Sequence, residues 1–278
     1  MDHLSSRGRW RLPAILTAAL LAGPAVASAQ DEEAAAAPGP IVTDRPTDSA
    51  SPELVPRGTF QLELGYKFTR LDAPSGRTDT QQAPDLLARF GINEKMEARL
   101  TVTGWSFKNV QTGKQSGFND LNLGAKIALA EERGKRPQMA LLADVSLPVG
   151  AVDFTDDYVI PKLLLLATHT LSGSAGLTWN LGPSVVTRAA GDGGSETDLT
   201  LNYAVALGRG VGDAFTLFGE VYGNFDFGQG FPDSHTFQVG TTILLSPLFQ
   251  VDVRGGIGIV ENVPDWLFGA GLAFRVPD

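Results

Sequence analysis

The chain has 278 residues, 32 glycines, no cysteine and a formal net charge of −9 at pH 7. The lack of cysteine excludes a lipid-modified N-terminal cysteine, a disulfide framework and a thiolate metal site. The acidic balance argues against nucleic acid as a partner, because binding to phosphates requires a basic face.

Residues 1–29 have the pattern of a secretion signal. Arg7, Arg9 and Arg11 precede a short apolar stretch, and Ala27-Ser28-Ala29 is a small-residue cleavage site. The apolar stretch is too short to be a membrane-spanning helix. Cleavage near Ala29 would leave 19 basic and 30 acidic residues, so the mature charge is predicted to be −11.

Residues 30–57 are predicted to form a separate segment, called the leader below. It is rich in alanine and proline and contains the sequence Thr43-Asp44-Arg45-Pro46. Such a composition cannot bury a core, and its prolines favour extended, non-strand backbone. The leader is therefore not expected to belong to the folded sheet.

Residues 58–278 are predicted to form a β-barrel. In the first strand, Phe60, Leu62 and Leu64 alternate with Gln61 and Glu63, so one face is apolar and the other is polar. The same pattern recurs in about twelve candidate strands. These are Gly58–Leu71, Thr80–Ile92, Met96–Phe107, Phe118–Ala130, Pro137–Pro148, Ile160–Leu171, Ala175–Arg188, Thr197–Leu207, Ala214–Phe227, Thr236–Leu245, Leu248–Val260 and Trp266–Val276.

The connections between these strands alternate in length. Short ones are Asn93–Lys95, Glu131–Arg136, Ser172–Ser174, Gly208–Asp213 and Ser246–Pro247. Longer polar ones are Asp72–Asp79, Lys108–Gly117, Val149–Val159, Ala189–Glu196, Asp226–His235 and Glu261–Asp265. This alternation predicts a closed, antiparallel, up-and-down barrel in the bacterial outer membrane, with short periplasmic turns and longer extracellular loops.

Several short motifs resemble a known family. Thr43-Asp44-Arg45-Pro46 and Pro52–Tyr66 are similar to the opening of the outer-membrane transporters named for the meta-cleavage pathway of phenol degradation. The ending Gly269–Arg275 is also similar, although members often stop at an aromatic residue soon after this arginine. The resemblance implies recognition by the barrel-assembly machinery, for which Phe274 would serve here, and aromatic or hydrophobic compounds as solutes.

Thirteen charged residues share the inward phase of the predicted strands. They are Glu63, Lys67, Arg89, Glu97, Arg99, Asp120, Lys126, Asp144, Lys162, Glu220, Asp252, Arg254 and Arg275. Charges facing lipid would be costly, so these side chains are expected to line the lumen. Two interpretations remain open: a salt-bridge network that fills a narrow barrel, and the lining of a solute path.

The sequence predicts no catalytic, cofactor or metal site. A barrel lipase needs a serine and a histidine together on the lipid face, and neither His169 nor His235 has an expected serine neighbour. Two acidic loops, Asp153–Asp157 and Gly191–Gly194, could offer oxygen ligands to calcium but match no calcium-loop spacing.

We therefore predict a passive outer-membrane channel or transporter for small solutes, expected to be monomeric. The alternative is a structural or surface-binding barrel that transports nothing, with a lipid-modifying enzyme third. The stretch Asp44, Arg45 and Pro46 is predicted to fold into the lumen as a partial plug or as one wall of the solute path, with Arg45 paired to Glu63, Glu97, Asp120 or Asp144. A periplasmic spacer is the alternative role for this segment.

Overall fold

The computed structural model describes residues 39–276 except 75, 112, 172, 190–193, 229–232 and 262. The predicted signal, the first part of the leader and residues 277–278 lie outside the described residues. No helix in the described part of the chain is long and apolar enough to cross a membrane.

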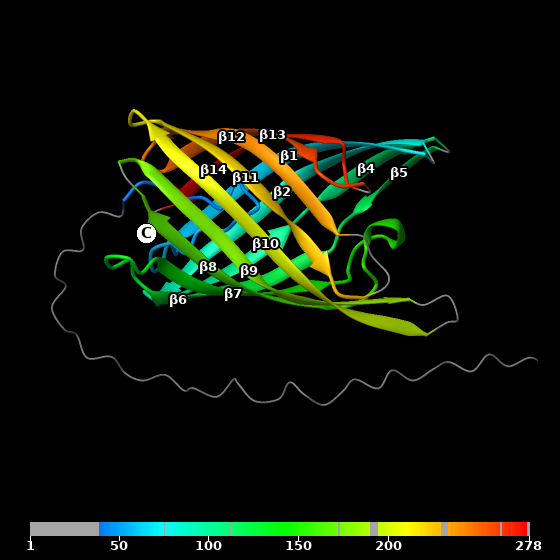
Figure 1. Ribbon diagram of the computed structural model, residues 1–278, viewed down its shortest axis with the longest axis horizontal. Helices are drawn as coiled ribbons and strands as arrows, with labels where there is room; N and C mark the ends of the chain where they lie inside the picture. Colours follow the sequence, from blue (N-terminus) through cyan, green and yellow to red (C-terminus); the bar gives the residue numbers. More distant parts are fainter. Residues whose placement is uncertain are drawn as a thin grey trace, which may run out of the picture. The chain divides into compact units, whose positions relative to one another are not determined.

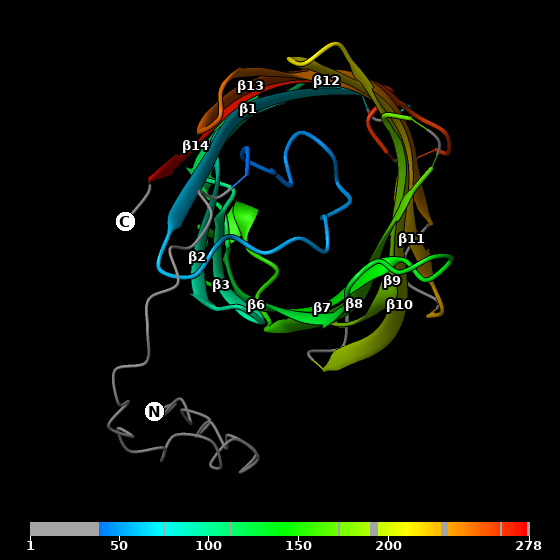
Figure 2. The same ribbon diagram turned by 90° about the vertical axis from the view of Figure 1, so that its left-hand side faces the viewer.

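The described residues form one antiparallel sheet that closes on itself (Figures 1 and 2). Its strands are β1 (Phe60–Ala73), β2 (Gly76–Asn93), β3 (Met96–Val102), β4 (Trp105–Val110), β5 (Gly113–Phe118), β6 (Leu121–Ala130), β7 (Gln138–Leu147), β8 (Ile160–Thr170), β9 (Ala175–Ala189), β10 (Ser195–Val211), β11 (Phe215–Asp226), β12 (Ser234–Ser246), β13 (Phe249–Gly258) and β14 (Trp266–Val276). A single 3-10 turn, η1 (Val152–Phe154), lies between β7 and β8. Because β1 pairs with both β14 and β2, the sheet closes into a barrel, although β5 pairs on one side only, with β4.

The fourteen segments make twelve barrel strands, which confirms the predicted closed twelve-stranded barrel. Both β3 and β4 pair with β2, and they are interrupted only at Thr103 and Gly104. Likewise β5 and β6 pair with β4 and β3, and are interrupted at Asn119 and Asp120. At Gly104 the backbone has a φ of +62°, and a Cβ would lie 2.2 Å from the carbonyl oxygen of Pro84, so only glycine fits this interruption.

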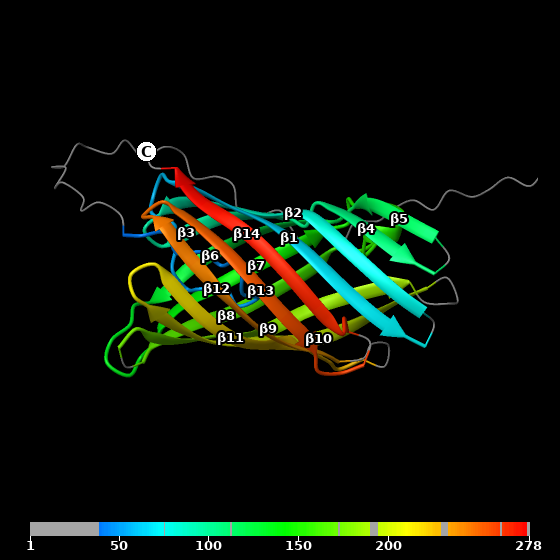
Figure 3. The same cartoon turned by 90° about the horizontal axis from the view of Figure 1, so that it is seen from above.

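The bounds predicted for three of the long connections are wrong. β1 and β2 continue their pairing to Ala73 and Gly76, and β4 and β5 form a hairpin across the predicted loop Lys108–Gly117. Pairing of β9 with β10 likewise extends to Ala189 and Ser195. Polar residues on both faces do not prevent backbone pairing in water, so these hairpins extend beyond the apolar part of the barrel (Figure 3). The end that carries them is called the hairpin end, and the opposite end, with the short connections, is called the turn end.

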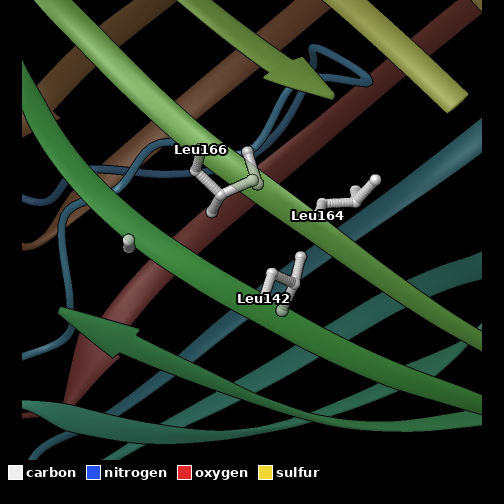
Figure 4. Close-up of a cluster of buried hydrophobic side chains, with 5 residues drawn as sticks. Leu142, Leu164 and Leu166 are labelled. Atoms are coloured by element: carbon white, nitrogen blue, oxygen red, sulfur yellow. The ribbon is translucent and has the colours of Figure 1, made fainter. Parts of the chain in front are cut away.

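The barrel is apolar outside and polar inside, the reverse of a soluble protein. Leu123 and Phe268 are 47% and 43% exposed on the outer surface, whereas Glu63 and Glu97 are fully buried inside. Strand alternation with period two produces this arrangement. An exception is a patch on β7 and β8, where Leu142, Leu164 and Leu166 point inward (Figure 4).

Candidate functional site: the leader inside the lumen

The described part of the leader, residues 39–57, crosses the lumen and returns (Figure 2). It begins beside the β12–β13 turn, where the amide of Ile41 donates to the carbonyl of Pro247 at 2.8 Å. It then reaches the wall formed by β9, β11 and β12, passes β6 and β3, and ends where the amide of Gly58 donates to Gly91 at 2.8 Å. The leader therefore contacts strands around most of the barrel.

Barrel side chains accept hydrogen bonds from the leader backbone. Glu63 accepts from the amide of Arg45 at 2.9 Å, and Glu97 accepts from the amide of Val55 at 2.8 Å. On the opposite wall the side chain of Asn180 both accepts from and donates to the backbone of Ala50, at 2.7 and 2.9 Å. These contacts satisfy amides that an irregular segment inside a barrel would otherwise leave unpaired.

Barrel cations bind the leader carbonyls in the same way. Arg89 donates to Glu53 at 2.8 Å, and Lys126 donates to Ser51 at 2.7 Å. Arg254 donates to the carbonyl of Pro46 at 2.6 Å. The leader is thus held mainly through its main chain, by charged side chains that would be costly to bury without partners.

Asp44 is the leader side chain with the most ionic contacts. Its carboxylate lies 2.6 Å from Arg99, 3.3 Å from Lys126 and 3.7 Å from Arg89, and these side chains are all buried. It also accepts from the amide of Ser51 at 2.9 Å, which ties the two sides of the leader loop together. Burial raises the pKa of the Asp44 carboxyl, but the three cations outweigh burial and hold this pKa well below its ordinary value.

The predicted partners of Arg45 are wrong. Its guanidinium lies 2.8 Å from Asp85 and 3.4 Å from Asp252, not beside the side chain of Glu63, Glu97, Asp120 or Asp144. The reason is that Gly65 and Gly271 have no side chain. The side chain of Arg45 therefore packs against their backbone, where a Cβ would collide with it. Pro46, the third residue of the predicted plug, is fully buried.

The predicted inward charges fall into three groups. Those that contact the leader are Glu63, Arg89, Glu97, Arg99, Lys126, Glu220, Asp252, Arg254 and Arg275. Lys67, Asp144 and Lys162 line a cavity beside the leader. Asp120 belongs to neither group, because its carboxylate accepts from the amides of Gly150 and Asp156, both at 2.8 Å, in the β7–β8 connection.

Sequence reasoning missed several residues that bind the leader. Asp85 shares the inward phase of Arg89 on β2 and could have been found from that phase. Asn180, Gln61 and Gln238 are buried and uncharged, so a search for inward charges omitted them. Gln61 donates to the carbonyl of Val42 at 2.9 Å.

Two cavities flank the leader along the barrel axis. The turn-end cavity, of about 390 Å³, is bounded by residues near the short turns, among them Ser174, Gly210 and Thr242. The hairpin-end cavity, of about 260 Å³, is bounded by residues nearer the long hairpins, among them Thr103 and Lys162. Four leader residues line both cavities: Arg45, Pro46, Thr47 and Ser49. The leader therefore forms the partition between the two cavities.

His235, one of the two histidines considered for lipase chemistry, has an aromatic environment. The hydroxyl of Tyr203 lies 3.1 Å from Nδ1 of His235, and the rings of Phe225 and His235 are 4.9 Å apart. Among the described residues there is no group of three or more His, Asp or Glu side chains placed to hold a metal ion. The Asp153–Asp157 loop is therefore not part of such a group, whereas residues 191–193 of the other acidic loop lie outside the described residues.

Comparison with solved structures shows the same architecture in outer-membrane channels. The COG4313 outer membrane channel from Pseudomonas putida F1 aligns over 83% of this chain and 100% of its own, with 13% identity and a TM-score of 0.63. The NanC porin aligns over 78% of this chain and 100% of its own, with 8% identity and a TM-score of 0.53. At these identities the likeness concerns the fold.

A search of curated protein sequences finds no match to this chain. A family model does match, over residues 43–276, which includes the Thr43–Pro46 motif, residues 47–57 of the leader and every barrel strand. The buried leader and the barrel around it are therefore matched as one unit, and the chain belongs to the family described as "Putative MetA-pathway of phenol degradation".

Proposed function

We propose that the protein is a passive outer-membrane channel for small solutes, closed in the described state by its own leader. The observation that carries this proposal is the partition: the cavities at the two ends of the barrel are separated by Arg45, Pro46, Thr47 and Ser49. A solute that crosses the barrel must therefore displace or rearrange this part of the leader. The fold of the solved channels supports the same function.

The lining favours a gate over a permanent filling. Nine barrel charges contact the leader, and each could be hydrated by water if the leader moved, since an open lumen admits water. The leader also buries apolar side chains: Ala50 packs against the Leu142, Leu164 and Leu166 patch, and Ile41 and Val55 are 4% and 1% exposed. A segment held mainly by polar contacts can exchange them for water at a modest free-energy cost.

We further propose that the chain acts as a monomer, assembled by the barrel-assembly machinery, with the hairpin end outside the cell. The channel is not an enzyme in this proposal, and the pairing of His235 with Tyr203 rather than a serine supports that view. The family description suggests aromatic compounds among its solutes.

Single-channel recording in planar bilayers tests the proposal. Deletion of residues 40–51 should raise the conductance severalfold, because it removes the partition while leaving the strands intact. A reversible version uses Ala50→Cys with Asn180→Cys, since the side chain of Asn180 already contacts the backbone of Ala50 and the chain has no other cysteine.

Oxidation of this pair should hold the conductance low, and reduction should raise it to the value of the single variant Asn180→Cys, which lacks the same hydrogen bonds to Ala50. The single variant Asn180→Cys, treated with the same oxidant and reductant, is the matched control. A barrel that stays sealed at all voltages after the deletion would contradict a channel and leave the structural or surface-binding role.

A further inference from the structure

We propose that the hairpin-end cavity binds a small amphipathic organic anion, with one carboxylate attached to an apolar ring or short chain. This inference rests on the proposed channel function and specifies its solute class. The cavity, of about 260 Å³, lies between the leader and strands β1, β2, β3, β7, β8 and β13. It is smaller than the pockets that hold drug-sized ligands, so it suits a molecule of a single ring.

The cavity is lined by cationic groups with unused hydrogen-bonding capacity. Neither Lys67 nor Lys162 has an ion pair or hydrogen bond with any other residue that the structure describes. Arg99 and Arg254 bind the leader through their terminal nitrogens, but the Nε of each is buried and has no partner in the described protein. Both arginines are less than 9% exposed and line the cavity.

The acidic side chains of the cavity are mostly committed elsewhere. Asp85 is paired with Arg45 at 2.8 Å, and Asp44 with Arg99 at 2.6 Å. Asp48 is paired with Arg254 at 3.0 Å. The remaining acid is Asp144, which lies opposite Lys162 in the β7–β8 register. The uncommitted charges are therefore two lysines and one aspartate, which leaves an excess of one positive charge for a monoanion.

The cavity is also lined by apolar side chains, which lie beside the charged groups in the barrel wall. Leu142 and Leu164 line it from β7 and β8, and Leu87 lines it from β2, each less than 10% exposed (Figure 4 shows the first two). Inward-facing leucines break the polar-inside pattern of such barrels. Leu166 is accounted for by its contact with the leader, but Leu142 and Leu164 also face the cavity. A ligand with both a negative charge and an apolar body can contact the cationic and the apolar side chains at once. Neither an inorganic anion nor a neutral hydrocarbon can do so.

Isothermal titration calorimetry on the purified, detergent-solubilised full-length mature protein provides the test. Benzoate is the probe, benzamide is the neutral molecule of the same shape, and acetate is the anion without the ring. Benzoate should bind saturably and at least about tenfold more tightly than either control, since a charged hydrogen bond and burial of the ring both contribute.

Three variants separate the site from general effects on folding. Lys67→Gln should weaken benzoate binding about five- to tenfold, as expected for the loss of one charged contact. Lys135→Gln, in the exposed β6–β7 turn, should leave it unchanged. Asp144→Asn should strengthen benzoate binding, because it removes the one uncommitted carboxylate, and a merely damaged barrel would not gain affinity.

Absence of benzoate binding, equal binding of benzamide, or equal effects of Lys67→Gln and Lys135→Gln would each overturn the site. Conductance in potassium chloride, recorded on the same preparations, reports separately on the channel. A conducting protein that ignores benzoate overturns this inference alone. A protein that binds benzoate but never conducts overturns the channel and leaves the binding site.

Discussion

The carboxylate of Glu220 on β11 accepts a hydrogen bond from the backbone amide of Ser49 at 2.7 Å, inside the barrel. Its second oxygen accepts from the amide of Asp48 at 2.9 Å, and the side chain is 1% exposed. The barrel thus binds the leader by its main chain at β11. This contact can be weakened without altering the leader sequence.

Glu220→Gln should loosen the leader while preserving the barrel. The substituted amide would place a donor group against two backbone donors, and an unsatisfied buried group of this kind costs about 1–3 kcal/mol. We expect a higher open probability in single-channel records and faster proteolysis of the leader. Glu94→Gln, in the exposed β2–β3 turn, is the matched control; if it changed gating as much, the Glu220 contact would be unimportant.

Asp44→Asn should have a larger effect, because the carboxylate is shared by three buried cations. Removing one partner from a buried ionic cluster costs about 3–5 kcal/mol. We expect the leader to be released and the conductance to approach that of the 40–51 deletion. Asp48→Asn removes a carboxylate that is 40% exposed, and should cost about 1 kcal/mol or less. Equal conductances in the two variants would contradict the central role of Asp44.

The depressed pKa of Asp44 also predicts how closure depends on pH. A carboxyl whose pKa is lowered by docking stabilises the docked leader fully above its undocked pKa, about 3.9, and this stabilisation is lost as pH falls through the lower docked value. The Asp44 contribution should therefore keep the channel closed from pH 8 to about pH 5. Conductance of the wild-type protein recorded across this range checks the prediction, and an opening between pH 7 and 5 would contradict it.

The two faces of β6 should respond differently to substitution. Leu123→Arg places a charge on the lipid face and should cost about 2–4 kcal/mol near the bilayer midplane, enough to reduce assembly. Lys126→Met removes an inward charge that contacts Ser51 and Asp44, so it should assemble but conduct more. Heat-modifiable migration on gels measures assembly, and Leu123→Met is the volume-matched control. Similar behaviour of Leu123→Arg and Lys126→Met would mean that the strand phase is misassigned.

The proposed orientation can be tested with a matched pair of cysteine variants. Lys114→Cys lies in β5 at the hairpin end, and Lys135→Cys lies in the β6–β7 connection at the turn end, both exposed. An impermeant thiol reagent should label Lys114→Cys on intact cells and label Lys135→Cys only after the cells are lysed. Because the natural chain lacks cysteine, the label reports only the introduced site. The reverse pattern would invert the barrel in the membrane.

The barrel fold and the phase of its strands could be predicted from the amino-acid sequence alone. Alternation with period two is a local property, so Phe60, Leu62 and Glu63 already reveal which face of β1 is apolar. Four of the five short connections were predicted at the right places; the fifth, Gly208–Asp213, was predicted to begin too early, because β10 stays paired with β11 to Val211. Their charged or glycine-containing sequences end each strand locally.

The pairing of inward-facing side chains with one another and with the leader could be read only from the tertiary structure. Arg45 and Asp252 are 207 positions apart in the chain, and their contact depends on closure of β1 against β14 and on the path of the leader. No local pattern reports such a distance. The same limit explains why the partners predicted for Arg45 were wrong, and why the β4–β5 hairpin was predicted to be a loop. Polar residues on both faces carry no burial signal, so pairing there is decided by the neighbouring strands.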